Sequence, residues 1–269
     1  MDHFYRYKYS NIELEILGAF IAKINSISQG NPVSLCDIWC SEIHLQSQDY
    51  SNRDKINNRA NSNPIKIIDR YGFFRYSSDK KNPSLIVINE FLIKQHTVGK
   101  IKYRNLLRTI VLIHEIGHWI EYCVSFNSKR KNPTIRSNFS SHNSEFHELW
   151  AQIFTYKCLS DSDLLNSLSP SAKDYIAECR KEMLKLSESQ PHKYRTFKLI
   201  LNDERASLDL IENCSFNYLF RFLELIRNKK GNYFHEFNRL MPVMDRMFMR
   251  EDFDKHNLMS DKFIKQDFL

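Results

Sequence analysis

Apolar residues recur at intervals of three and four along residues 11–27, NIELEILGAFIAKINSI. This spacing places them on one face and predicts an amphipathic helix. The pattern then breaks up, and the polar, Asn- and Ser-rich residues 46–64 are expected to form a surface connection. Two runs rich in β-branched and aromatic residues follow, IKIIDRYGFFRY at 65–76 and SLIVINEFLI at 84–93, with SSDKKNP between them. Two such runs on either side of turn residues predict a β-hairpin.

The second half of the chain has the pattern of helices. Apolar residues are nearly continuous over 103–126, which predicts a helix buried on most sides. A polar loop at 127–144 separates it from EFHELWAQIFTYKCL at 145–159, which predicts a second long amphipathic helix. Ser169 as an N-cap and Pro170 at the first helical position predict a third helix that begins there.

This order of elements predicts an α+β fold that is predominantly helical, with a small β-sheet before the helix at 103–126. Helical patterns continue beyond 187–193, in runs such as NYLFRFLELIR. We therefore expect one domain over residues 1–188 and a helical C-terminal extension or subdomain over 189–269. A chain of 269 residues, of which 42% are hydrophobic, is long enough to bury a sizeable core.

No uninterrupted apolar run approaches the roughly 20 residues that a membrane span needs, and the start, MDHFYRYKYS, lacks the apolar core of a secretory signal. The expectation is a soluble protein with no membrane partner and no classical export signal. Six dispersed cysteines lack the density of a disulfide scaffold and predict reduced thiols in a cytoplasmic-type environment. Cys36 and Cys40 are spaced for one helical face, and packing is preferred over metal binding because no further pair follows at zinc-finger spacing.

The net charge of the chain is +7, from 39 Lys and Arg against 32 Asp and Glu. Such an excess invites a nucleic-acid partner. The basic residues are scattered in short clusters, however, as at 79–81, 129–131 and 228–230, and no RNA- or DNA-binding motif accompanies them. Solvated surface is the preferred interpretation of these clusters, and nucleic-acid binding remains the least favoured hypothesis.

The helix predicted at 103–126 carries polar residues where burial would favour leucine. His114, Glu115 and His118 form an HExxH motif within TIVLIHEIGHWIEY. On a helix the two histidines lie one turn apart on one face, so both imidazoles can reach one zinc ion at about 2.0–2.1 Å. Glu115 is placed to contact a zinc-bound water without binding the metal, as a general base for hydrolysis must. The competing interpretation, two ordinary core histidines, has to explain three clustered polar groups whose burial is costly when they are unpaired.

A catalytic zinc site needs a third protein ligand and one open position. Val124 stands six residues after His118, so the elongated motif with a third histidine is absent. The next predicted helix offers Glu145 and Glu148 instead. Glu148 is the favoured ligand because it lies on a narrow stripe of small and polar residues, where Ala151 leaves room for a neighbouring helix.

The stretch HEIGH, followed after a loop by ELWAQIF, resembles the gluzincin metallopeptidases, whose third zinc ligand opens a helix of the type E-x-x-A followed by Asp or Glu. More narrowly, residues 84–185 resemble the catalytic domain of anthrax lethal factor at the level of motifs. The resemblance implies a zincin-like metallopeptidase core, with one Zn2+ held by His114, His118 and Glu148 and with Glu115 as the base. It also implies an endopeptidase that hydrolyses peptide bonds of a protein substrate, as a bacterial toxin or an effector translocated into the cytosol of another cell.

Two positions depart from the pattern of that family. Gln152 stands where the family has an acid that orients a zinc-binding histidine, so this contact would be neutral. Ser141 stands at the spacing of a tyrosine that stabilises the oxyanion, a role for which His142 is the preferred substitute and Tyr156 a second candidate. These departures support an alternative function: a catalytically weak or inactive zincin-fold module that binds a protein partner through the helical region after residue 190.

The strand predicted at 84–91 has two open interpretations. In zincins an edge strand beside the cleft pairs with an extended substrate, which points to a polypeptide. Four successive apolar residues at 85–88 equally fit a core strand. The basic cluster at 129–131 follows the motif helix along the chain and predicts a preference for acidic residues in the substrate.

Overall fold

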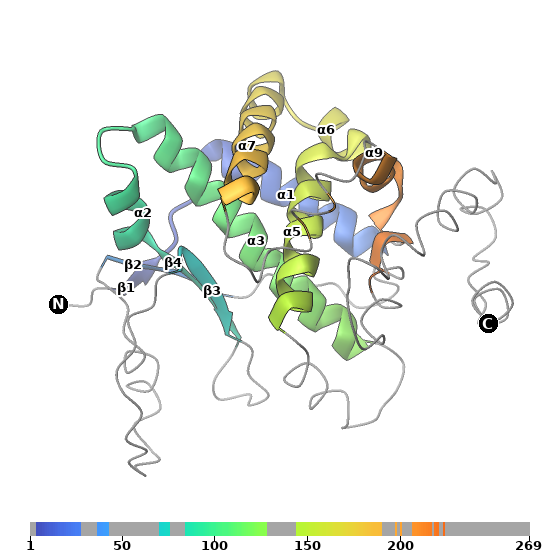
Figure 1. Ribbon diagram of the computed structural model, residues 1–269, viewed down its shortest axis with the longest axis horizontal. Helices are drawn as coiled ribbons and strands as arrows, with labels where there is room; N and C mark the ends of the chain where they lie inside the picture. The colour runs from blue at the N-terminus through green and yellow to red at the C-terminus, as the bar shows by residue number, and fades with distance from the viewer. Residues whose placement is uncertain are drawn as a thin grey trace, which may run out of the picture.

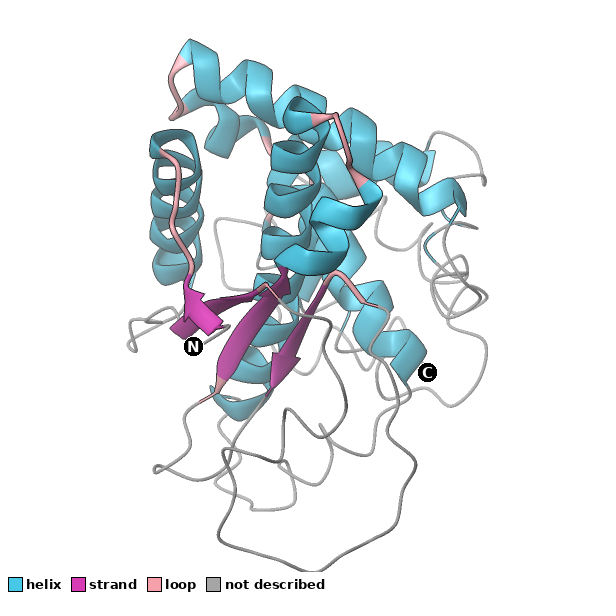
Figure 2. Ribbon diagram, turned by 90° about the vertical axis from the view of Figure 1, so that its left-hand side faces the viewer, coloured by secondary structure: helices cyan, strands magenta, loops and turns pink. Residues whose placement is uncertain are grey.

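The computed structural model describes residues 4–27, 37–42, 70–75, 84–127, 144–189 and 206–216, together with residues 197, 200, 218–220 and 223. Helices make up most of these residues, and four short strands form one sheet. Figure 1 shows the sheet as a small layer at one side of the molecule, and Figure 2 shows it near the centre of the view, with most of the helices above it. The predicted α+β class with predominant helix is therefore confirmed.

The sheet has the strand order β1-β2-β4-β3, in which β2 and β4 are parallel and the two outer pairs are antiparallel. The antiparallel pairing of β3 with β4 confirms the hairpin partners predicted from the sequence. The bounds of the strands are β1 (Phe4–Arg6), β2 (Asp37–Ser41), β3 (Gly72–Arg75) and β4 (Leu85–Asn89).

The sequence pattern did not predict β1 and β2. They contain only three and five residues, and their pairing joins segments that lie far apart in the chain. Cys40 is buried in β2, which contradicts the helical spacing assumed for it but agrees with its interpretation as a packed residue. Its presumed partner, Cys36, lies outside the described residues.

The position of β4 decides between the two interpretations of that strand. β4 lies between β2 and β3, and its residues 86–89 are buried. The edge-strand interpretation of 84–91 is therefore wrong, because the hairpin partner β3 takes the outer position. β3 is the outer strand at this end of the described sheet. It also packs against the helix that carries the HExxH motif.

None of the helices among the described residues combines the length and apolar character needed to cross a membrane. α3 is the longest of them and runs through the middle of the molecule, against α5, α7 and the strands β3 and β4 (Figure 1). The helices are α1 (Asn11–Ile27), α2 (Glu90–His96), α3 (Ile101–Asn127), α5 (Ser144–Ser160), α6 (Ser162–Asn166), α7 (Pro170–Ser189) and α9 (Ala206–Asn213).

The helix bounds follow local signals in the sequence. α1 coincides with the predicted amphipathic segment, and α7 begins at Pro170 as expected. The strand predicted to continue to residue 93 ends instead at Asn89, whose side chain accepts a hydrogen bond from the backbone N–H of Leu92 and caps α2. One asparagine thus turns a continuous apolar run into a strand followed by a helix.

A buried polar network fixes the N-terminal half of α3. The hydroxyl groups of Tyr7 and Thr109 both donate to Oε1 of Glu13 on α1, at 2.5 and 3.0 Å. Arg108 forms an ion pair with the buried Glu90 of α2, at 2.9 Å between Nε and Oε1. Because buried hydrogen bonds and ion pairs are costly to break, these contacts hold α3 in one orientation just before its HExxH motif.

The aromatic residues of α5 pack against the region that follows α7. Trp150 stacks on Phe220 with ring centroids 5.5 Å apart, and Phe154 contacts Phe216 and Phe220. The buried apolar residues described between 197 and 223 therefore share a core with α5. The boundary between residues 188 and 189 stays a prediction.

Candidate metal centre

α3 and α5 approach closely at two small residues. A Cβ atom added to Gly117 of α3 would lie 3.0 Å from Cα of Ala151 and 3.1 Å from Cδ1 of Phe154 on α5. Even an alanine at this position would require Ala151 or Phe154 to shift by a few tenths of an ångström. The sequence hypothesis that Ala151 leaves room for a neighbouring helix is thereby confirmed.

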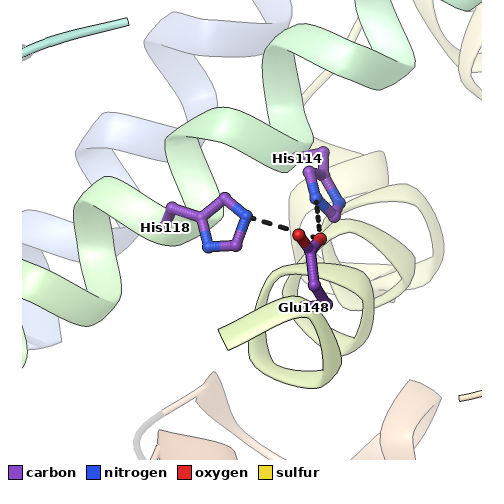
Figure 3. Close-up of side chains that lie close together, drawn as sticks. All are labelled: His114, His118 and Glu148. Carbon is purple, nitrogen blue, oxygen red and sulfur yellow. Dashed lines mark hydrogen bonds and ion pairs between the residues drawn. The ribbon is translucent and has the colours of Figure 1, made fainter. Parts of the chain in front are cut away.

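This close approach brings the three predicted metal ligands together (Figure 3). Nε2 of His114 lies 3.1 Å from Oε2 of Glu148, and Nε2 of His118 lies 3.7 Å from the same oxygen. The three ligand atoms all lie within 4.8 Å of one another. Zinc–ligand bonds of about 2.0–2.2 Å in a tetrahedral site require separations of about 3.3 Å between ligand atoms. The two separations to Glu148 are near this value, so the three side chains could hold a metal ion such as zinc.

The contacts within this group change the pKa values of Glu148 and His118. Burial alone would raise the pKa of Glu148, but its contacts with His114 and His118 outweigh burial and hold that pKa well below its usual range. Burial alone would lower the pKa of His118. The hydrogen bond to Glu148 outweighs burial and raises this pKa to about 9. Glu148 is thus an ionised carboxylate at neutral pH, as a metal ligand must be.

Glu115 is buried beside this group, with 5% of its surface exposed. Burial raises the pKa of Glu115 above its ordinary value, against the opposing effect of the two histidines. Its Oε2 atom is buried without a hydrogen-bond partner among the described residues. On the other side, a Cβ atom added to Gly72 of β3 would lie 3.0 Å from Oε1 of Glu115. The carboxylate thus lies between α3 and β3, with one oxygen left for a partner such as a water molecule.

Of the other predicted site residues, the structure describes Tyr156 and Gln152 but not His142. Tyr156 lies eight residues after Glu148, about 12 Å along the helix, and its hydroxyl donates to Glu212 of α9, so it does not join the three ligands. Gln152 is buried one turn after Glu148, as expected. His142 and the basic cluster at 129–131 lie outside the described residues, and of Glu145 only the position on α5 is described.

A second contact between α3 and α5 was not predicted from the sequence. Nδ1 of His147, the residue before Glu148, lies 2.9 Å from both carboxylate oxygens of Glu121, which is three residues after His118. Glu121 is fully buried. A glutamate inside the apolar run of α3 was a visible signal, but its partner could not be identified without the register of the two helices.

Comparison of the chain with protein-family models, with curated proteins and with solved structures finds no match. The chemistry of the site therefore has to be argued from its own geometry. Within the described part of the chain, His114, His118 and Glu148 form a group of residues that could hold a metal ion.

The contact at Gly117 leads to a first prediction. Gly117→Val should lower the free energy of unfolding by about 1–3 kcal/mol, because the added methyl groups overpack the interface between α3 and α5. It should also weaken zinc binding, since the helices that carry the ligands must separate. Gly18→Val is the matched control, because Gly18 lies on α1 with no atom within 4 Å of an added Cβ. Thermal unfolding and zinc titration of both variants check the prediction, and equal behaviour of the two would contradict it.

Proposed function

We propose that the protein is a zinc-dependent endopeptidase with a zincin-like core of the gluzincin type. The observation that carries this proposal is the convergence of two histidines from α3 and one carboxylate from α5 on a common point, beside the buried carboxylate of Glu115. Three protein ligands with one position left open are typical of catalytic zinc sites, whereas structural zinc sites use four protein ligands.

Each residue has a distinct task in this proposal. The imidazoles of His114 and His118 and the carboxylate of Glu148 would hold the metal. Zinc at such a site supplies a Lewis acid and lowers the pKa of a water molecule at its open position. Glu115 would accept a proton from the attacking water and pass it to the leaving amine, and its raised pKa suits a group that must do both near neutral pH.

A polypeptide substrate is supported by the surroundings of Glu115. β3 packs along α3 at this residue, so a chain extended beside β3 would pass the carboxylate. Phe74 of β3 and Tyr122 of α3 pack with ring centroids 5.9 Å apart, and Tyr122 lies one turn after His118. We propose that this aromatic pair contacts the bound substrate beside the metal. A role as a toxin or translocated effector is supported by the resemblance alone.

Metal removal tests the proposal directly. The purified protein should contain about one zinc ion per chain and should hydrolyse an unfolded protein substrate. A strong chelator should abolish hydrolysis, and added zinc should restore it. Elemental analysis and peptide mapping by mass spectrometry provide the two readouts. A protein that takes up no zinc would refute the proposal.

The alternative, a zincin-fold binding module with little or no turnover, is favoured by one observation. Gln152, buried one turn after Glu148, is neutral where an acid would strengthen the basicity of a zinc-binding histidine. Stoichiometric zinc without hydrolysis of any peptide in a proteome-derived library would favour this alternative over the enzyme.

A further inference from the structure

A hydrogen bond between a histidine and a buried glutamate joins α3 and α5 immediately beside the proposed metal ligands. The Nδ1 atom of His147 lies 2.9 Å from both Oε1 and Oε2 of Glu121. The carboxylate of Glu121 has no exposed surface, and the side chain of His147 is 18% exposed. Burying a carboxylate in this way is costly unless a partner offsets the cost, so the contact is expected to have one preferred geometry.

Both residues of this pair lie close to proposed ligands along their helices. Glu121 follows His118 by three residues on α3, and His147 directly precedes Glu148 on α5. The contact between Gly117 and Ala151 lies on the other side of the ligand group along α5, since Ala151 follows Glu148 by three residues. Glu148 on α5 and His118 on α3 thus each lie between a close van der Waals contact and a buried hydrogen bond.

These two contacts constrain the helices in different ways. Van der Waals contact at Gly117 sets how near the helices come, but it has little directional preference and would allow one helix to slide along the other. A hydrogen bond to a carboxylate is directional and stronger than one between neutral groups. The Glu121–His147 pair therefore restrains how far α3 can shift along α5, and the separations of the three ligand atoms depend on that register.

We propose that Glu121 and His147 are positioning residues of the metal centre, which hold the ligand-bearing turns of α3 and α5 in the register that zinc requires. This inference rests on the proposed function, because it takes His114, His118 and Glu148 to be zinc ligands. The pair also places a carboxylate near the ligands at a site where position 152 holds only a neutral glutamine. Residues that orient metal ligands contribute strongly to affinity, and their loss typically weakens metal binding about 10–100-fold.

The test is the zinc affinity of the full-length protein, measured by competition with a chromophoric chelator. Glu121→Ala and His147→Ala should each weaken zinc binding about 10–100-fold. Glu121→Gln should lose less, because its amide oxygen can still accept a hydrogen bond from Nδ1 of His147. The double variant Glu121→Ala/His147→Ala should bind zinc no more weakly than either single variant, as expected for residues that act as one unit.

Thr109→Val is the control for loss of stability alone. Thr109 is also buried on α3 and hydrogen-bonds with Glu13 and Tyr175, but it precedes the motif by more than one turn. This variant should melt at a lower temperature in the metal-free state and keep the wild-type zinc affinity. Should Glu121→Ala fail to fold, the double variant, which leaves no unpaired buried charge, supplies the comparison.

Two results would overturn different conclusions. Zinc affinities within about twofold of wild type in the folded Glu121 and His147 variants would overturn the positioning role and leave the proposed function standing. Absence of zinc binding by the wild type would overturn the proposed function and this inference with it. An affinity loss in Thr109→Val equal to that in Glu121→Ala would also reject the positioning role, because general loosening of α3 would then explain both.

Discussion

Zinc is expected to disappear from the purified protein when Glu148 is replaced by alanine. Among the described residues of the candidate metal group, only the two histidines on one face of α3 would remain. The loss of affinity should exceed the roughly 100-fold that removal of a residue contacting a ligand causes, since a bond to the metal itself is lost. Elemental analysis after dialysis against a weak chelator measures the effect.

Glu145→Ala is the matched control for this variant, because Glu145 lies one turn earlier on the same helix and was the other glutamate that the sequence offered. It should keep the zinc content of the wild type. Circular dichroism of both variants separates loss of zinc from loss of fold. If Glu148→Ala kept its full zinc content while Glu145→Ala lost it, the third-ligand assignment would be wrong.

The grouping of His114, His118 and Glu148 could be predicted because it depends largely on local periodicity. The two histidines share a face of α3 whatever the rest of the fold does, since residues four apart on a helix always lie one turn apart. Glu148 was identified by a stripe of small and polar residues on the next helix, which requires no knowledge of the angle between the helices. For the same reason α1 was predicted with its observed bounds.

The features that escaped prediction depend on contacts between distant segments. β1 and β2 are too short to show a pattern, and the central place of β4 follows from pairing with β2, which lies more than 40 residues earlier. Tyr156 shares a helix with Glu148, but its orientation toward Glu212 depends on where α9 packs. The Glu121–His147 contact likewise depends on the register of α3 against α5. None of these contacts can be predicted from the sequence of one of the two contacting segments alone.

Replacement of Glu115 by glutamine should lower kcat/KM about 100- to 10,000-fold while zinc content and fold are retained. The amide cannot accept a proton from water, and positioned general bases contribute rate enhancements of this size. Glutamine has the shape of glutamate, and because Glu115 is buried with a raised pKa, loss of its charge should cost the folded state little. Steady-state hydrolysis, metal content and thermal unfolding are measured on the same preparation.

Glu90→Gln provides the control for removal of a buried glutamate charge, because Glu90 is equally buried but lies on α2 and pairs with Arg108. It should lose stability, since Arg108 would keep a weaker partner, and its kcat/KM should stay near that of the wild type. Glu115→Gln should thus lose catalysis and keep stability, whereas Glu90→Gln should lose stability and keep catalysis. Wild-type hydrolysis by Glu115→Gln would exclude Glu115 as the base, whereas a wild-type protein that binds a partner but never cleaves it would identify the fold as a binding module.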